Sequence, residues 1–158
     1  MKPESQLTLI ADHAGFELKE LIKVYLQTDF SFEIRDLSPN FVTDDDYPEV
    51  VSKLLVGGNH SNSRILALCG SGVGMTIALN KIKHIRAFNA YNDAITISAR
   101  EDNNCNALCL GARFVDFGLA KIIVRTFLTT KFSDQARHTR RVNELDLLFE
   151  KGKSTITN

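Results

Sequence analysis

The sequence has no tryptophan, only three prolines and three cysteines, and no surplus of charge, with 19 Lys and Arg against 19 Asp and Glu in 158 residues. A chain of this length buries roughly 68–70% of its unfolded surface, so it needs neither disulfides nor a metal to hold a core. Binding to a nucleic-acid backbone requires an excess of cationic side chains, so the balanced charge argues against a nucleic-acid partner. Any anion site must therefore be local.

The three cysteines, Cys69, Cys105 and Cys109, cannot all pair, and none has a spacing typical of a metal site. This pattern fits a reducing compartment, and we interpret Cys105 and Cys109 as buried core thiols. The N-terminal segment is polar, and no apolar run approaches the ~18–20 residues that span a bilayer. We expect a soluble cytoplasmic protein without a membrane partner, built as a single domain over 1–158 with a frayed tail at about 151–158.

Short apolar runs rich in β-formers alternate along the chain with segments of helical periodicity. The predicted strands are 7–11, 32–37, 64–69, 85–90 and 107–111. Predicted helices include 16–26, 76–82, 118–128 and 136–150. Strands that are apolar on both faces and are joined by helices are typical of βαβ units. The sequence therefore predicts an α/β fold, a three-layer α/β/α sandwich around a five-stranded parallel sheet.

A glycine-rich turn, with Gly70, Gly72 and Gly74, follows the third predicted strand. Ligands of open α/β sheets bind beyond the carboxyl ends of the strands, and glycines let backbone N–H groups turn toward an anion. The dipole of the following helix favours the thiolate form of Cys69. A buried core thiol is the alternative for Cys69, but the glycines favour a base or nucleophile beside an oxyanion-binding loop. No GK[ST] follows the turn, which disfavours a nucleotide site.

Two further clusters are candidates for binding an anion or a polar substrate. Asp12 and His13 directly follow the first predicted strand, although Asp12 alone could simply cap the next helix. Arg137 and Arg141 lie four residues apart on a predicted helix and share a face suited to a phosphate, whereas Arg140 points elsewhere. A solvated basic face is the alternative for this helix.

Five short segments in one order carry a resemblance to a known family. They are DHAGFELK from residue 12, DYPE from 46, CGSGVGM from 69, the segment 99–113 and RHTRRV from 137. Together they resemble the ribose-5-phosphate isomerase B family, which also contains the galactose-6-phosphate isomerase subunits. The resemblance implies a Rossmann-like sheet, a homodimer or dimer of dimers with sites completed by both chains, and a C-terminal helix that extends to the partner subunit. It implies no metal and no organic cofactor.

The resemblance also assigns catalytic roles to matching residues. Cys69 matches the base that removes the proton next to the carbonyl. Ser71 and the amides of the loop, including Gly70, Gly72 and Gly74, match the group that stabilises the enediolate.

Other matching residues are assigned to the substrate. Asp12 matches a contact to the sugar hydroxyls. The further matches are phosphate ligands and pocket positions, namely His13, Arg113, Arg137 and Arg141 for phosphate, and Tyr47 and Asn103 for the pocket.

One position departs from the family pattern. The residue before Asn103 is Asp102, where the family has a histidine assigned to opening the sugar ring. A carboxylate can still act as an acid or base, or the role passes to another group such as His138.

The leading hypothesis is an aldose–ketose isomerase that interconverts ribose 5-phosphate and ribulose 5-phosphate through a cis-enediol(ate), with Cys69 as base. This reaction needs one base to move a proton between C1 and C2, and donors that face the oxygen on which charge develops. Two alternatives stay open. One is an isomerase of a hexose 6-phosphate such as allose or galactose 6-phosphate, and the other is a non-catalytic subunit that binds a sugar phosphate.

Overall fold

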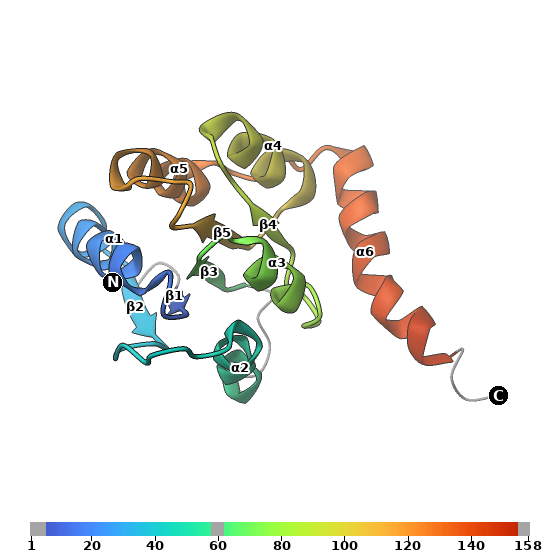
Figure 1. Cartoon of the computed structure of the whole chain (residues 1–158). Helices are drawn as coiled ribbons and strands as arrows, with labels where there is room; N and C mark the ends of the chain where they lie inside the picture. Colours follow the sequence, from blue (N-terminus) through green and yellow to red (C-terminus); the bar gives the residue numbers. More distant parts are fainter. Residues whose placement is uncertain (1–5, 58–61, 155–158) are drawn as a thin grey trace.

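The computed structural model describes residues 6–57 and 62–154, which form a parallel sheet covered on both faces by helices (Figure 1). The strands follow the order β2-β1-β3-β5-β4, and every neighbouring pair is parallel. Their bounds are β1 (Gln6–Ala11), β2 (Glu33–Asp36), β3 (Arg64–Cys69), β4 (Ala87–Asn89) and β5 (Ala107–Gly111). The predicted three-layer sandwich with a Rossmann-like five-stranded sheet is confirmed.

The accuracy of the predicted strand ranges depends on the position of each strand in the sheet. The central strands β3 and β5 have the predicted bounds, and β1 begins one residue earlier than predicted. The strands β2 and β4 are shorter than predicted, and both lie at the edges. An edge strand pairs on one side only, so fewer ladder hydrogen bonds hold its ends in the extended conformation.

Two helical layers bury the two faces of the sheet in separate clusters. The elements of one layer are α1 (Phe16–Asp29), α4 (Asp93–Asn103) and α5 (Phe117–Thr129), and those of the other are α2 (Tyr47–Ser52), the 3-10 helix η1 (Lys53–Gly57) and α3 (Val73–Leu79). Leu9 of β1 packs with Ile22 and Phe127 on one face, whereas Ile10 packs with Met75 on the other. The strands are therefore apolar on both faces, as the sequence indicates.

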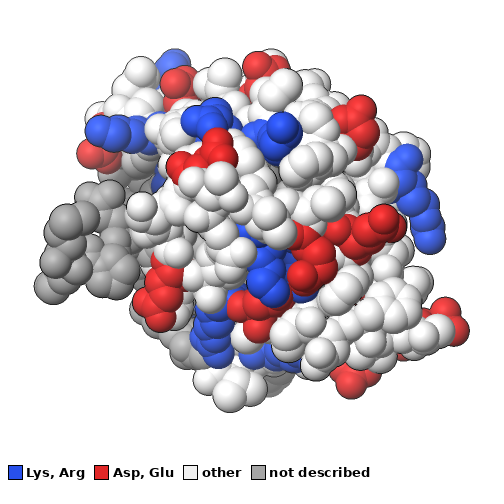
Figure 2. Space-filling view, turned by 90° about the vertical axis from the view of Figure 1, so that its left-hand side faces the viewer, with Lys and Arg blue, Asp and Glu red and all other residues white. Residues whose placement is uncertain are grey.

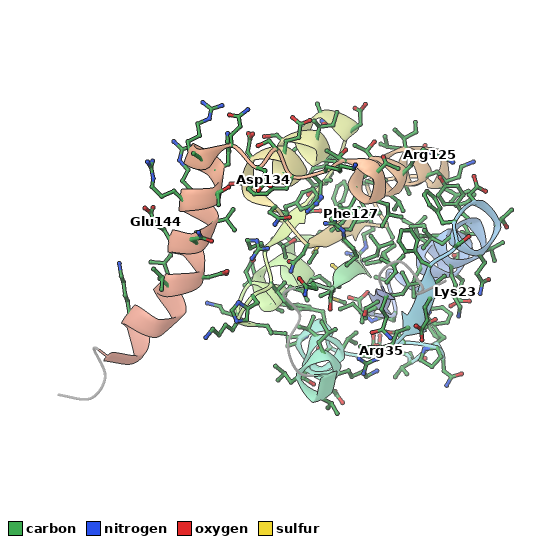
Figure 3. All side chains as sticks on the ribbon, turned by 180° about the vertical axis from the view of Figure 1, so that it is seen from behind. Lys23, Arg35, Arg125, Phe127, Asp134 and Glu144 are labelled. Atoms are coloured by element: carbon green, nitrogen blue, oxygen red, sulfur yellow. The ribbon has the colours of Figure 1, made fainter. Side chains whose placement is uncertain are left out.

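The last helix, α6 (Ala136–Ser154), lies at one side of the sandwich (Figures 1 and 3), and its Asp146 pairs with Arg86, just before β4, at 3.4 Å. It continues four residues beyond its predicted end, and residues 155–158 of the predicted tail lie outside the described residues. Its start packs against α4, while Leu145, Leu147 and Leu148 are exposed. Its predicted contact with a partner subunit remains a prediction.

The surface carries charges of both signs. On the face at the left of Figure 1, Lys and Arg side chains are interspersed with Asp and Glu (Figure 2). None of the helices in the described ranges combines the length and the apolar character that a membrane crossing requires.

Candidate active site

The predicted glycine turn lies at the carboxyl end of β3, over the side chain of Cys69. Cys69 is 4% exposed, and its Sγ accepts a hydrogen bond from the backbone N–H of Gly72 at 3.0 Å. Gly72 precedes α3 with a φ of 81°, which lies in the left-handed region that glycine adopts at little cost. The chain thus bends back over the sulfur and directs a backbone donor to it.

The other two glycines of the turn lie against functional side chains. A Cβ added to Gly70 would lie 2.8 Å from Cζ of Arg113, and one added to Gly74 would lie 2.8 Å from the ring of Tyr47. The hydroxyl of Ser71 accepts a hydrogen bond from the N–H of residue 73 at 3.3 Å. Arg113 and Tyr47 therefore lie against the loop of Cys69.

The turn after β1 brings a carboxylate and an imidazole to the same edge. Asp12 accepts a hydrogen bond from the N–H of Gly15 at 3.0 Å, so it closes the turn and does not cap α1, whose N-cap is Gly15. Burial raises the pKa of Asp12 above its usual range, in spite of the opposing hydrogen bonds and the nearby His13. The Asp12 carboxyl group therefore lies, nearly buried, at the edge where the resemblance places the sugar hydroxyls.

His13 is held by a residue that the sequence analysis did not single out. Its Nδ1 lies 3.1 Å from Oδ1 of Asp45, and its backbone N–H donates to the same oxygen at 2.6 Å. This side-chain hydrogen bond raises the pKa of His13, which favours a cationic imidazole. The run of three aspartates before Tyr47 was the available signal in the sequence.

Two more residues at this edge were missed by the sequence analysis. Asn89, the last residue of β4, donates from Nδ2 to the carbonyl oxygen of Ser71 at 3.0 Å, and the Tyr91 hydroxyl lies 3.4 Å from the same oxygen. Both belong to a strand end, so the rule that led to Cys69 would also have led to them.

The remaining predicted site residues lie at the opposite edge of the sheet, where the strands begin. Asp102 and Asn103 end α4, just before β5 begins, and Arg137 and Arg141 lie on α6. A five-residue strand such as β5 separates the two edges by about 13 Å, at about 3.3 Å per residue. Within one chain, the predicted residues therefore form two groups.

We name these groups by their places in the fold. The carboxyl-edge group consists of Asp12, His13, Tyr47, Cys69, Ser71, Arg113 and the glycines 70, 72 and 74. The α4–α6 group consists of Asp102, Asn103, Arg137, His138 and Arg141.

His138 is the buried centre of the α4–α6 group, with 4% exposure. Its Nδ1 lies 2.9 Å from the carbonyl oxygen of Asp102, and its Nε2 accepts a hydrogen bond from Nε of Arg137 at 2.8 Å. Both ring nitrogens are therefore engaged, which leaves no free nitrogen for opening a sugar ring. The Asp102 carboxylate is 46% exposed and accepts a hydrogen bond from Ser98 at 3.2 Å.

The other two cysteines lie in the core. Cys105 and Cys109 are buried, and burial raises the pKa of Cys105 to about 11 and that of Cys109 to about 12. Their prediction as core thiols is confirmed. Among residues 6–57 and 62–154, no three His, Cys, Asp or Glu side chains gather so that they could hold a metal ion.

Comparison with known proteins decides the family. A family model described as Ribose/Galactose Isomerase matches residues 7–145. The chain belongs to this family. Ribose-5-phosphate isomerase B of Escherichia coli is 35% identical over 136 residues, which is 85% of this chain and 89% of that protein. The resemblance inferred from the five segments is confirmed.

Two further members of the family bear on the substrate. D-erythrulose-4-phosphate isomerase of Pectobacterium atrosepticum is 35% identical over 131 residues, or 77% of this chain and 81% of that protein. The crystal structure of ribose-5-phosphate isomerase B from Mycoplasma genitalium with bound ribulose 5-phosphate superposes with a TM-score of 0.82. It is 33% identical and covers 94% of this chain and 98% of its own.

Proposed function

We propose that the protein is an aldose–ketose isomerase that interconverts ribose 5-phosphate and ribulose 5-phosphate, with Cys69 as the base. Membership in the ribose/galactose isomerase family implies aldose–ketose isomerisation. The observation that carries the proposal is the Cys69 sulfur at a strand end, under a loop whose Gly72 N–H is directed to it at 3.0 Å. A thiolate so placed can act as a base. The loop that covers it has further N–H groups for the negative charge that develops on the substrate oxygen.

The proposed reaction moves one proton between two carbons. The Cys69 thiolate removes the proton from C2 of the open-chain aldose, and the electrons of that bond form the enediolate. The sulfur then returns the proton to C1, while the hydroxyl proton of O2 moves to O1. N–H groups of the loop and the Ser71 hydroxyl stabilise the enediolate oxygen, and buried Asp12 is suited to contact the hydroxyls during this transfer.

The separation of the two residue groups supports a site completed by a second copy of the chain. The carboxyl-edge group holds the proposed base, whereas Arg137 and Arg141 lie at the far edge, exposed to solvent. Neither of these guanidiniums forms an ion pair with a carboxylate among the described residues. The exposed leucines of α6 are an apolar surface of the kind that subunit interfaces bury. We therefore propose a homodimer in which α6 brings its arginines to the partner's Cys69 loop.

Mixing two inactive variants tests this composite site. Cys69→Ala disables the carboxyl-edge group, and Arg141→Ala disables the α4–α6 group. When the two chains are co-expressed at equal levels, mixed dimers contain one site with both defects and one intact site, so about a quarter of the wild-type activity returns. If both residues belong to one chain's own site, the mixture stays as inactive as its components.

Asp102 favours a tetrose 4-phosphate as a second candidate substrate. The oxygen that would close a five-membered ring carries the phosphate in such a sugar, so catalysis requires no ring opening. Asp102 stands where the family pattern has the ring-opening histidine, and both nitrogens of His138 are engaged. The similarity to D-erythrulose-4-phosphate isomerase supports this candidate.

A substrate panel distinguishes the candidates. We would measure kcat/KM for ribose 5-phosphate, allose and galactose 6-phosphates and erythrose 4-phosphate with the wild type and with Asp102→His. The leading proposal predicts the highest kcat/KM for ribose 5-phosphate. A higher kcat/KM for the tetrose or for a hexose would make that sugar the proposed substrate instead. If Asp102 lies at the ring-opening position, Asp102→His raises the rate on ribose 5-phosphate but not on the tetrose.

A further inference from the structure

The peptide unit between Ser71 and Gly72 is held at both of its polar ends. Its carbonyl oxygen accepts a hydrogen bond from Nδ2 of Asn89 at 3.0 Å and lies 3.4 Å from the hydroxyl of Tyr91. Its N–H donates to Sγ of Cys69 at 3.0 Å. Because a peptide unit is planar and trans, its C=O and N–H point in opposite directions. Side chains that fix the carbonyl therefore also fix the direction of the N–H toward the sulfur.

Asn89 and Tyr91 form a closed set of hydrogen bonds around the carbonyl. Asn89 Nδ2 donates one hydrogen to Ser71 and the other to the Tyr91 hydroxyl, at 2.8 Å. The hydroxyl is then free to donate its own hydrogen to the Ser71 oxygen. The ring of Tyr91 packs edge-on against Phe114, with 6.4 Å between the ring centroids. Both donors are thus placed before any substrate binds.

The peptide unit between Ser71 and Gly72 is closely packed between β4 and β5, and two glycines make this close packing possible. A Cβ added to Gly111 of β5 would lie 2.5 Å from the Ser71 carbonyl oxygen. A Cβ added to Gly72 would lie 2.3 Å from Oδ1 of Asn89. The backbone of Gly111 and the Asn89 amide therefore approach the peptide unit closely, at two positions where no Cβ fits.

The two ends of the Asn89 amide differ in their hydrogen bonding. Its Oδ1 is buried and has no hydrogen-bond partner among the described residues. A buried acceptor without a partner destabilises the folded state, and an apolar side chain of similar size would remove that cost. What the asparagine adds is the donor pair of Nδ2, which no apolar residue supplies.

We propose that Asn89 and Tyr91 are positioning residues of the isomerase, which direct the Gly72 N–H to Cys69 by holding the Ser71 carbonyl. The inference rests on the proposed role of Cys69 as the base. A hydrogen bond donated to an anionic sulfur is stronger than one donated to a neutral thiol, so a fixed N–H favours the thiolate. Neither residue is required to touch the sugar.

Other titratable groups lie around the Cys69 loop. Arg113 lies beside Gly70, Asp12 and His13 lie on the turn after β1, and Tyr47 begins α2. The Cys109 thiol stays neutral because burial raises its pKa to about 12. Substitution of Asn89 or Tyr91 changes none of these groups, so a change in the ionisation of Cys69 reports on the N–H.

Alkylation of Cys69 by iodoacetamide, followed across pH by mass spectrometry, measures the thiolate without substrate. Cys105 and Cys109 are buried thiols with raised pKa values and serve as slow internal references. We expect the pH midpoint of Cys69 alkylation to rise in Asn89→Leu, so that the rate at neutral pH falls about tenfold, as for one pH unit. Tyr91→Phe gives a smaller change in the same direction.

Asn80→Leu is the matched control. The Asn80 amide makes two hydrogen bonds to the backbone of Ala87 at the other end of β4, so its loss lowers stability but leaves the alkylation midpoint unchanged. An unchanged midpoint in both Asn89→Leu and Tyr91→Phe overturns the inference, even if Cys69→Ala abolishes turnover. The pKa that limits kcat/KM at low pH should shift by the same amount as the alkylation midpoint. If the midpoint rises but this pKa does not, Asn89 and Tyr91 do position the N–H, but Cys69 is not the base.

Discussion

The imidazole of His13 and the carboxylate of Asp45 form a pair across 32 positions of sequence, with Nδ1 and Oδ1 3.1 Å apart. The hydrogen bond from Asp45 raises the pKa of His13, so the ring keeps its positive charge to a higher pH than a free histidine. A sugar phosphate near this edge therefore meets a cation whose charge depends on Asp45.

Asp45→Asn should lower the pKa of His13 toward the ordinary value of about 6.5. The amide retains an acceptor for the His13 backbone, so the turn stays folded. KM for the sugar phosphate should rise, most at pH values above the lowered pKa. The His13 pair stabilises the protein below about pH 6.5, and this contribution is lost as pH rises through the higher folded-state pKa. NMR titration of the His13 ring checks the prediction, and an unchanged midpoint contradicts it.

Gly72→Ala should disable the loop over Cys69. The residue has a φ of 81°, and its new Cβ would lie 2.3 Å from Oδ1 of Asn89, so the N–H directed to the sulfur must move. The same movement displaces the other N–H groups of the loop, and loss of one donor to the enediolate oxygen lowers kcat by about 10²–10³. Gly118→Ala is the control, because it has an ordinary helical position in α5 and only a marginal contact, at 3.3 Å from Asp116. Equal kcat values for Gly72→Ala and Gly118→Ala would show that the loop has no role in catalysis.

A buried ion pair beneath the turns makes a further prediction about stability. Lys19 is fully buried, and its Nζ lies 2.9 Å from Oδ2 of Asp36. Asp36→Ala removes one of two carboxylates that pair with this ammonium and leaves it with Glu20 at 2.6 Å, so the change should cost about 1.5–3 kcal/mol of unfolding free energy. Asp29→Ala breaks an exposed pair with Arg125, at 3.0 Å, and should cost about 0–1 kcal/mol. Urea unfolding of both variants measures the difference, and similar losses would contradict the account.

The pair between Lys19 and Asp36 also predicts how stability changes at low pH. Burial alone would raise the pKa of Asp36, but hydrogen bonds from Lys23 and Lys19 hold it below its usual value. The stabilisation is thus present above the ordinary aspartate pKa of about 3.9 and is lost as pH falls through the lowered value. The stability difference between the wild type and Asp36→Ala should therefore shrink only below about pH 4.

The sequence predicts best what depends on periodicity. The ranges of β3 and β5 are correct because both strands are buried on each side, so that all their residues except Arg64 are apolar. Asp45 was missed because it lies in a loop whose path follows no repeat, and it reaches His13 only through the fold. Asn89 was missed because a polar residue at the end of an edge strand resembles ordinary turn chemistry.

The local sequence also does not predict that the candidate site residues of one chain form two separate groups. Arg137 and Cys69 each fit the family's motifs. They lie at opposite ends of the strands because Cys69 ends β3, whereas Arg137 lies near the end of α4, where β5 begins. The resemblance implies shared sites, and the topology of one chain supplies the physical reason. The expected cytoplasmic location stays a prediction.

The central claim is that Cys69 is the base, and Cys69→Ala tests it most directly. Exchange of the C2 hydrogen of ribose 5-phosphate with deuterium from solvent would be followed together with turnover, and ribulose 5-phosphate binding would be measured by calorimetry. Cys109→Ala, which removes a buried thiol of β5, is the control. The account predicts that Cys69→Ala lowers both rates by about 10²–10⁴ with nearly unchanged binding, while Cys109→Ala keeps them. Turnover and exchange by Cys69→Ala close to those of the wild type would contradict it.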